Sequence, residues 1–160
     1  MRLSVDEVFR AYGDRLFTVA FNLCQNRADA DDVVQDTLIK YYTLGKEFED
    51  ETHLKAWLIR LAVNRAKDIT TSFWRRNKVE WEDYMDELPF REPEDSRLFE
   101  AVMRLPEKYR LVIHLFYYED YAVEEIARIL RRPAGTVKSQ LNRGRGLLKE
   151  MLKEEWDDDK

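Results

Sequence analysis

Cysteine, histidine and glycine are scarce in this sequence. Its 160 residues include one Cys, two His and five Gly. The single Cys24 excludes an intrachain disulfide, and together with His53 and His114 it does not form a zinc-ligand cluster. The sequence also lacks a glycine-rich phosphate-binding loop and a Ser-His-Asp pattern. We therefore expect a binding protein without a metal or cofactor, and not an enzyme.

Long apolar runs are missing as well. No stretch approaches the roughly 18 to 20 apolar residues that a membrane-spanning helix needs. The first residues, MRLSVDEVFRAYG, lack the apolar core of a signal peptide. With 44% hydrophobic and 37% charged residues, the composition is that of an ordinary soluble protein. We expect a cytoplasmic protein that does not insert into a membrane, folded as one domain or two small ones.

Charge is distributed in blocks, although the formal net charge is only -5. The segment 29–50 is mainly acidic, 55–78 is mainly basic, and 80–100 is acidic again. The run 128–149 then holds seven basic residues and no acidic one, and EEWDDDK closes the chain. Blocks of opposite sign predict separate surfaces for different partners.

Helical periodicity dominates wherever a period is clear. Apolar stripes at i, i+3 and i+4 spacing are formed by Val33, Val34, Thr37, Leu38 and Tyr41; by Leu54, Trp57, Leu58, Leu61, Ala62 and Ile69; and by Tyr109, Val112, Ile113 and Phe116. Asp31 or Asp32 is a candidate cap for the first of these helices, and Pro106 suits the first turn of the third. No alternating strand pattern occurs. The chain is predicted to be all-α.

An acidic linker divides the predicted helices into two small domains. Pro89 and Pro93 lie in the acidic segment and discourage a continuous helix there. The predicted organisation is a helical domain at 1–78, a linker at 79–97, a second helical domain at 98–153 and an acidic tail at 154–160.

The second domain contains a predicted helix-turn-helix. Val123, Ile126, Ala127 and Leu130 form a short apolar stripe, which Pro133 interrupts. The helix that follows is predicted to turn one set of residues inward, namely Val137, Leu141, Gly144 and Leu148, and another set outward, namely Ser139, Asn142, Arg143 and Gly146. Two short helices with a tight turn and a polar, basic second helix are typical of DNA-binding proteins.

The outward residues have the chemistry that DNA recognition needs. Arg143 and Asn142 are candidates for base edges, since Arg pairs with guanine and Asn with adenine. Further basic and hydroxyl residues are candidates for phosphate contacts that position the helix: Arg132, Thr136, Lys138, Ser139 and Arg145. A solvated basic helix face is the alternative interpretation of this run.

Three stretches together resemble a known family. The segment 105–152, LPEKYRLVIHLFYYEDYAVEEIARILRRPAGTVKSQLNRGRGLLKEML, resembles the promoter-reading domain of bacterial sigma factors of the extracytoplasmic-function group, and also the helix-turn-helix of response regulators. ADADDVVQDTLIKYY resembles the family's polymerase-binding helix, and WLIRLAVNRAKD resembles its minus-ten helix. The resemblance implies a sigma factor that directs promoter-specific transcription initiation.

The resemblance also implies where the partners bind. Contacts with core RNA polymerase are expected from Asp32, Val33, Gln35, Asp36 and Leu38. Contacts with the minus-ten element, including the non-template single strand, are expected from Arg60, Asn64, Lys67, Asp68, Arg75 and Arg76. The helix-turn-helix residues above would meet the double-stranded minus-thirty-five element. An anti-sigma factor is an expected further partner.

Other interpretations of the first domain remain open. Acidic residues at a helix start are favoured by the helix dipole, which accounts for 29–32 without any partner. A metal site there would lack the glycine turn and distal Glu of a calcium loop. Phe73 and Trp74 are candidates for base stacking, and Trp57 is expected in the core. The acidic linker residues Glu82, Asp83, Asp86 and Glu87 either pass through polymerase or form a solvated tether.

The chain departs from the family pattern in its second domain. Gln140 stands where arginine is common, Gly144 where alanine is common, and Gly146 adds another glycine to the recognition helix. Ala122 replaces the usual hydroxyl cap, so Asp120 or solvent is expected to serve the free amides. Two rival classes remain: a stand-alone helix-turn-helix regulator, and a helical adaptor that does not use Lys138, Asn142 and Arg143.

Overall fold

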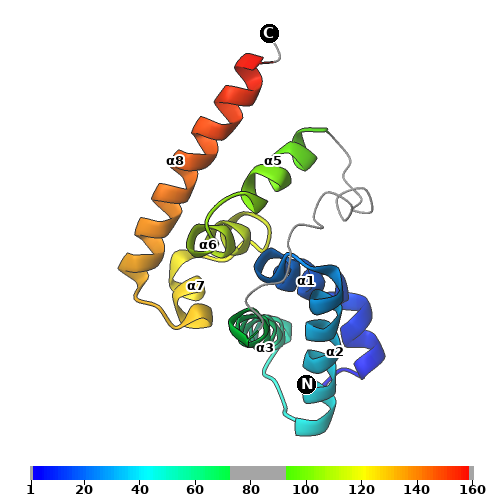
Figure 1. The fold of residues 1–160 in the computed structure, drawn as a ribbon. Coiled ribbons are helices and arrows are strands. Elements are labelled where there is room, and N and C mark those ends of the chain that lie inside the picture. The colour runs from blue at the N-terminus through cyan, green and yellow to red at the C-terminus, as the bar shows by residue number, and fades with distance from the viewer. Residues whose placement is uncertain (1, 73–92, 159–160) are drawn as a thin grey trace. The chain divides into compact units, whose positions relative to one another are not determined.

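The computed structural model describes residues 2–72 and 93–158. Within these residues it contains seven α-helices and no strand, which confirms the all-α prediction (Figure 1). The chain divides into two compact units, Met1–Glu80 and Trp81–Lys160. Each unit is described separately below.

The first unit begins with α1 (Val5–Cys24), a helix that none of the apolar stripes above predicted. A capping box starts it: the Glu7 backbone N–H donates to Ser4 Oγ at 3.1 Å, and the Ser4 N–H donates to Glu7 Oε1 at 3.2 Å. Ser-x-x-Glu before an apolar run is a readable start signal. The helix ends at Gln25, which takes a left-handed conformation with φ 51°.

Helix α2 (Arg27–Leu44) starts earlier than its apolar stripe suggested. Its cap is Asn26, whose side-chain oxygen accepts from the Asp29 backbone N–H at 2.9 Å. The prediction of Asp31 or Asp32 as the cap is therefore wrong, because both lie inside the helix and are exposed. Gly45, with φ +58°, terminates α2 in the conformation that glycine adopts most readily.

Arg2 secures the C-terminal end of α2. Its guanidinium donates to the carbonyl oxygens of Lys46 at 3.1 Å and Tyr41 at 3.2 Å, and it lies 4.6 Å from the centre of the Tyr41 ring. The Tyr41 hydroxyl in turn donates to the Leu3 carbonyl. A cation at a helix C-terminus satisfies carbonyls that have no partner within the helix and opposes the helix dipole.

The core of the first unit lies where α1 packs on both α2 and α3 (Glu51–Ser72), which also pack on each other (Figure 1). Its largest fully buried side chains are Leu16, Phe21, Tyr41, Leu54, Leu58 and Ile59. Trp57 was expected in the core. It is half-buried at the edge of the core, with its ring in edge contact with the buried Phe48 at 5.2 Å and the buried Tyr41 at 6.3 Å.

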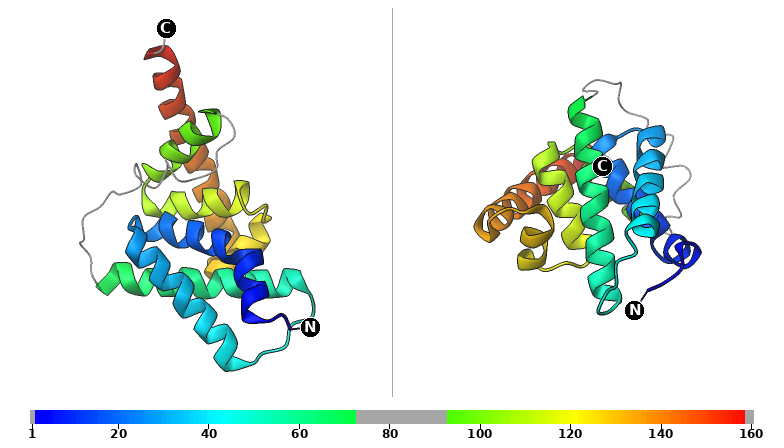
Figure 2. Two further views of the ribbon diagram at one scale, coloured as in Figure 1. Left: turned by 90° about the vertical axis from the view of Figure 1, so that its right-hand side faces the viewer. Right: turned by 90° about the horizontal axis from the view of Figure 1, so that it is seen from below.

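The second unit contains α5 (Pro93–Met103), α6 (Glu107–Tyr117), α7 (Val123–Leu130) and α8 (Ala134–Asp158) (Figure 2). The long helix α8 packs against the other three. The largest fully buried side chains of the second unit are Leu105, Leu111, Ile113, Leu115, Ile126 and Leu141. Residues 93–97 of the predicted linker are helical, with Pro93 at the first position, where a missing N–H costs nothing. Residues 154–158 of the predicted tail are also helical.

Candidate functional site

The outer face of α2 carries most of the residues expected to meet polymerase. Asp32 and Gln35 are exposed, and Asp36 and Leu38 are partly exposed. Val33 has no exposed surface, because it lies on the opposite side of the helix and packs in the core. It supports the helix and has no surface to offer a partner.

Two large apolar residues that the sequence analysis did not select complete this face. Ile39 is 62% exposed and Tyr42 is 71% exposed. At 100° per residue they lie on the same side of α2 as Gln35. Two large apolar side chains exposed on one helix face, one of them aromatic, are typical of a protein-binding surface. We call this set, Asp32, Gln35, Asp36, Leu38, Ile39 and Tyr42, the α2 outer face.

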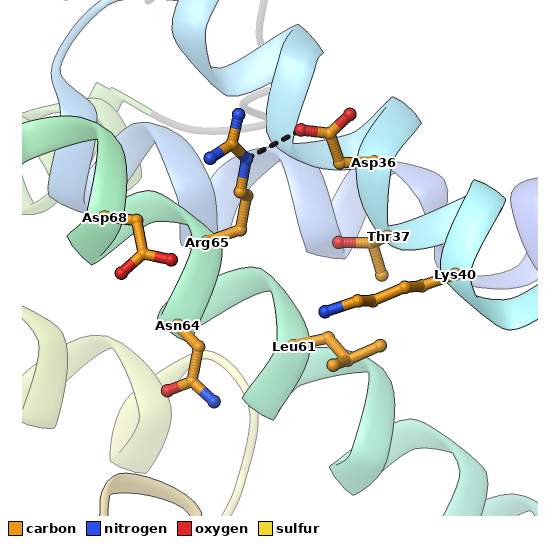
Figure 3. A pocket seen from close by; sticks show the side chains of 7 residues that line it. All are labelled: Asp36, Thr37, Lys40, Leu61, Asn64, Arg65 and Asp68. Carbon is orange, nitrogen blue, oxygen red and sulfur yellow. Dashed lines mark hydrogen bonds and ion pairs between the residues drawn. The ribbon is translucent and has the colours of Figure 1, made fainter. Parts of the chain in front are cut away.

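Two of the expected minus-ten residues on α3, Asn64 and Asp68, border a groove between α2 and α3 (Figure 3). The groove has a volume of about 410 Å³ and is lined by Asp36, Thr37, Lys40, Leu61, Asn64, Arg65 and Asp68. Asn64 and Asp68 are exposed and lie about one turn apart on α3. Across the groove Arg65 Nε lies 2.6 Å from Asp36 Oδ2. The groove therefore joins the α2 outer face to the expected DNA surface.

The remaining minus-ten residues differ in accessibility. Lys67 and Arg60 are half-buried, and the Arg60 Nε is enclosed without a hydrogen-bond partner in the described part of the chain. Arg75 and Arg76 lie outside the described residues, as do Phe73, Trp74 and the linker residues 82–87.

The helix-turn-helix forms as the sequence predicts. Helix α7 ends at Arg131, with φ 56°, and the Arg132 N–H donates to the Ala127 carbonyl at 3.0 Å to close the turn. Pro133 directly precedes α8, and its carbonyl accepts from the Thr136 N–H at 3.0 Å. The inward set is confirmed by the burial of Val137, Leu141, Gly144 and Leu148. The residues Thr136, Lys138, Ser139, Asn142, Arg143 and Arg145 are all exposed.

Three arginines at the expected DNA surface are held by neighbouring side chains. Arg132 donates to Gln140 Oε1 at 2.9 Å, and burial lowers the pKa of its guanidinium. Arg145 donates from Nε to the Tyr117 hydroxyl at 2.6 Å. A hydrogen bond from Arg143 lowers the pKa of the Tyr109 hydroxyl. Such contacts restrict long side chains before DNA arrives, which reduces the entropy lost on binding.

The start of α7 has no side chain that replaces the missing hydroxyl cap. The Ala122 backbone N–H donates to Glu125 Oε1 at 2.9 Å, which is half of a capping box. Asp120 instead takes a left-handed conformation, with φ 58°, in the loop before the helix. Glu125 therefore serves the N–H of the cap residue itself. No side-chain cap hydrogen bond reaches the free amides of the first turn, so of the two expected partners Asp120 does not serve them.

Gly144 and Gly146 of the recognition helix α8 have opposite surroundings, so we expect opposite effects of alanine. A Cβ at Gly144 would lie 3.0 Å from Ile113 Cγ1, whereas one at Gly146 would meet nothing within 4 Å. Gly146→Ala should stabilise the fold by about 0.5 to 1 kcal/mol through helix propensity. Gly144→Ala should destabilise it, because overpacking costs about 1 to 3 kcal/mol. Urea unfolding followed by circular dichroism measures both; equal stabilisation would show that Ile113 yields.

Among residues 2–72 and 93–158, no three His, Cys, Asp or Glu side chains converge as metal ligands. No helix in the described ranges combines the length and the apolar character needed to cross a membrane.

Comparison with known proteins identifies the two units. Residues 8–79 match the family model Sigma-70 region 2, and residues 96–148 match Sigma-70, region 4. The chain is 28% identical to the ECF RNA polymerase sigma factor SigW of Bacillus subtilis, over 92% of this chain and 88% of that protein. It is 31% identical to the RNA polymerase sigma-E factor of Streptomyces coelicolor, over 94% and 86% of the two chains.

A solved structure shares the fold. The sigma factor RpoE of Bartonella quintana, determined in complex with the anti-sigma factor NepR, aligns with a TM-score of 0.72 and 23% identity, over 92% of this chain and 96% of that one. The chain belongs to the extracytoplasmic-function group of RNA polymerase sigma factors. It is a transcription initiation factor that binds core RNA polymerase and promoter DNA.

Proposed function

We propose that the α2 outer face binds core RNA polymerase, that α3 recognises the minus-ten element and that α8 recognises the minus-thirty-five element. The observation that carries this assignment is the exposure of a mixed acidic and apolar face on α2 together with the exposed polar and basic residues of α8. The first composition suits a protein partner and the second suits DNA.

The individual roles follow from the chemistry of each surface. On α8, Asn142 and Arg143 are assigned to base edges. The phosphate contacts are assigned to Arg132, Thr136, Lys138, Ser139 and Arg145. On α3, Asn64 and Asp68 are assigned to an unstacked base of the non-template strand, with Arg60 and Lys67, and in sequence Arg75 and Arg76, along its backbone.

Control by an anti-sigma factor belongs to the same proposal. The support is the structural relative whose complex contains one. The protein would act in the cytoplasm, where core polymerase and the chromosome are available to it.

The decisive experiment is transcription with purified core polymerase on a promoter selected by the holoenzyme from a random library. Specific initiation that requires the chain supports the proposal. Failure to bind core, or initiation without sequence preference, would overturn it. A stand-alone regulator would instead shift a specific duplex without polymerase, and a helical adaptor would be insensitive to replacement of Lys138, Asn142 and Arg143.

Asn64→Ala should impair strand opening more than duplex binding, because Asn64 is assigned to a base that leaves the stack. Losing a polar contact to a flipped base should reduce the opening rate about tenfold, which corresponds to about 1.4 kcal/mol. Permanganate reactivity of unpaired thymines measures opening, and filter binding measures the closed complex. A matched control is Asn142→Ala, which should weaken binding of the duplex in the closed complex, unlike Asn64→Ala. Equal loss of both properties in Asn64→Ala contradicts the role.

A further inference from the structure

An ion pair connects the two helices that carry the polymerase surface and the minus-ten surface. Arg65 on α3 donates from Nε to Asp36 Oδ2 on α2 at 2.6 Å (Figure 3). The two residues are 29 positions apart in sequence, so the contact depends on the packing of α2 against α3. It is the point at which the α2 outer face reaches the groove.

The charged side chains that line the groove are equal in number for the two signs. They are Lys40 and Arg65, which are cationic, and Asp36 and Asp68, which are anionic. Nucleic acid backbones are bound by cationic groups, and a carboxylate beside Arg65 opposes that binding. A partner that engaged Asp36 would leave two cations and one anion in the groove.

The accessibility of the pair makes such an exchange feasible. The Arg65 side chain is 47% exposed and that of Asp36 is 43% exposed. Ion pairs in water-accessible positions are weak, because the solvent competes with both partners. A polymerase contact to Asp36 can therefore replace Arg65 without opening the core, and the released guanidinium stays on the exposed side of α3, next to Asn64.

We propose that Arg65 is a DNA-binding residue of the minus-ten surface and that Asp36 restrains it until core polymerase takes over Asp36. The inference rests on the proposed assignment of α2 to polymerase and of α3 to single-stranded DNA. Because binding linkage is reciprocal, single-stranded DNA bound to Arg65 must also favour polymerase binding at Asp36. Asp36 acts here as a positioning residue, since it influences DNA through Arg65.

The test uses the full chain without polymerase and a fluorescein-labelled single-stranded oligonucleotide carrying the selected minus-ten sequence. Asp36→Asn should increase the affinity about two- to fivefold, which is the range expected for loss of a water-accessible ion pair. Asp32→Asn is the matched control, because it removes the same charge from the same helix at an exposed position with no role in the groove. It should give only the smaller gain that any lost negative charge produces.

The double variant Asp36→Asn, Arg65→Ala decides whether Arg65 carries the effect. Its affinity should fall to or below that of the parent chain. If Asp36→Asn gains no more than Asp32→Asn, or if the gain persists without Arg65, the restraint of Arg65 is overturned.

A separate measurement tests the polymerase half of the proposal. Arg65→Ala should raise the affinity for core polymerase about twofold, because Asp36 no longer has to leave a partner. An unchanged or reduced affinity overturns the competition for Asp36. A chain that binds no core at all would refute the assignment of α2, while the oligonucleotide data would still decide whether Asp36 restrains Arg65.

Discussion

Replacing Tyr42 by alanine should weaken binding to core RNA polymerase about 10- to 100-fold while leaving the fold intact. Tyr42 is 71% exposed and lies beside Ile39, which is 62% exposed, on the α2 outer face. Truncation of an aromatic anchor at the centre of an interface costs about 1.4 to 2.8 kcal/mol, which corresponds to that range of affinity. Little stability should be lost, because neither side chain contributes much buried surface to the free protein.

The matched control for this variant is Leu44→Ala. Leu44 is 58% exposed on the same helix, but at 100° per residue it points to the side opposite Gln35. Fluorescence anisotropy with labelled chain and purified core should show near-parental affinity for Leu44→Ala and a large loss for Tyr42→Ala. Comparable affinities for the two variants would remove the α2 outer face as the polymerase surface.

Helical periodicity could have identified Ile39 and Tyr42 from the sequence. Val33, Val34 and Tyr41 mark the buried side of α2, and residues about 180° away must face outward. The family motif covers Asp32–Leu38, so it stops short of the two apolar residues and includes the buried Val33. Two large apolar side chains exposed together on one helix face are informative, because the period of the helix does not explain them.

The helix-turn-helix was predictable because its signals are local. Pro133, the inward stripe and the outward basic residues all fall within one short segment. The pairing of Arg145 with Tyr117 was not predictable, since it joins residues 28 positions apart. Gly144 shows the same limit: its helix-propensity cost can be read from sequence, but the Ile113 side chain that would crowd a Cβ comes from α6.

Helix starts can be predicted from capping residues better than from the first residue of an apolar stripe. Ser4 and Glu7 form a readable capping box, yet α1 carries no apolar stripe that the sequence analysis recognised. For α2, the first apolar residues of the stripe suggested a start near Asp31. The helix gains one more turn because Asn26 caps it before any stripe residue is reached.

Acidification should destabilise the second unit through His114, and the effect should reach about 2 kcal/mol between pH 7.5 and pH 5. His114 on α6 is 2% exposed, and burial lowers its pKa from 6.5 to about 4. As the pH falls below 6.5, the unfolded chain binds a proton that the folded chain excludes. The contribution of neutral His114 to the free energy of unfolding is therefore complete well above pH 6.5 and declines as the pH falls to 4. The total loss is about 3 kcal/mol, since each pKa unit is worth 1.36 kcal/mol.

The titration of His114 can be separated from that of the acidic residues by comparing variants. Urea unfolding of the parent chain and of His114→Gln, each at pH 7.5 and pH 5, should give a pH-dependent loss about 2 kcal/mol smaller in the variant. Any stability that His114→Gln loses at neutral pH does not affect this comparison, because each protein is compared only with itself at the two pH values. If His114→Gln keeps the parental slope, the buried imidazole is not the source of the acid sensitivity.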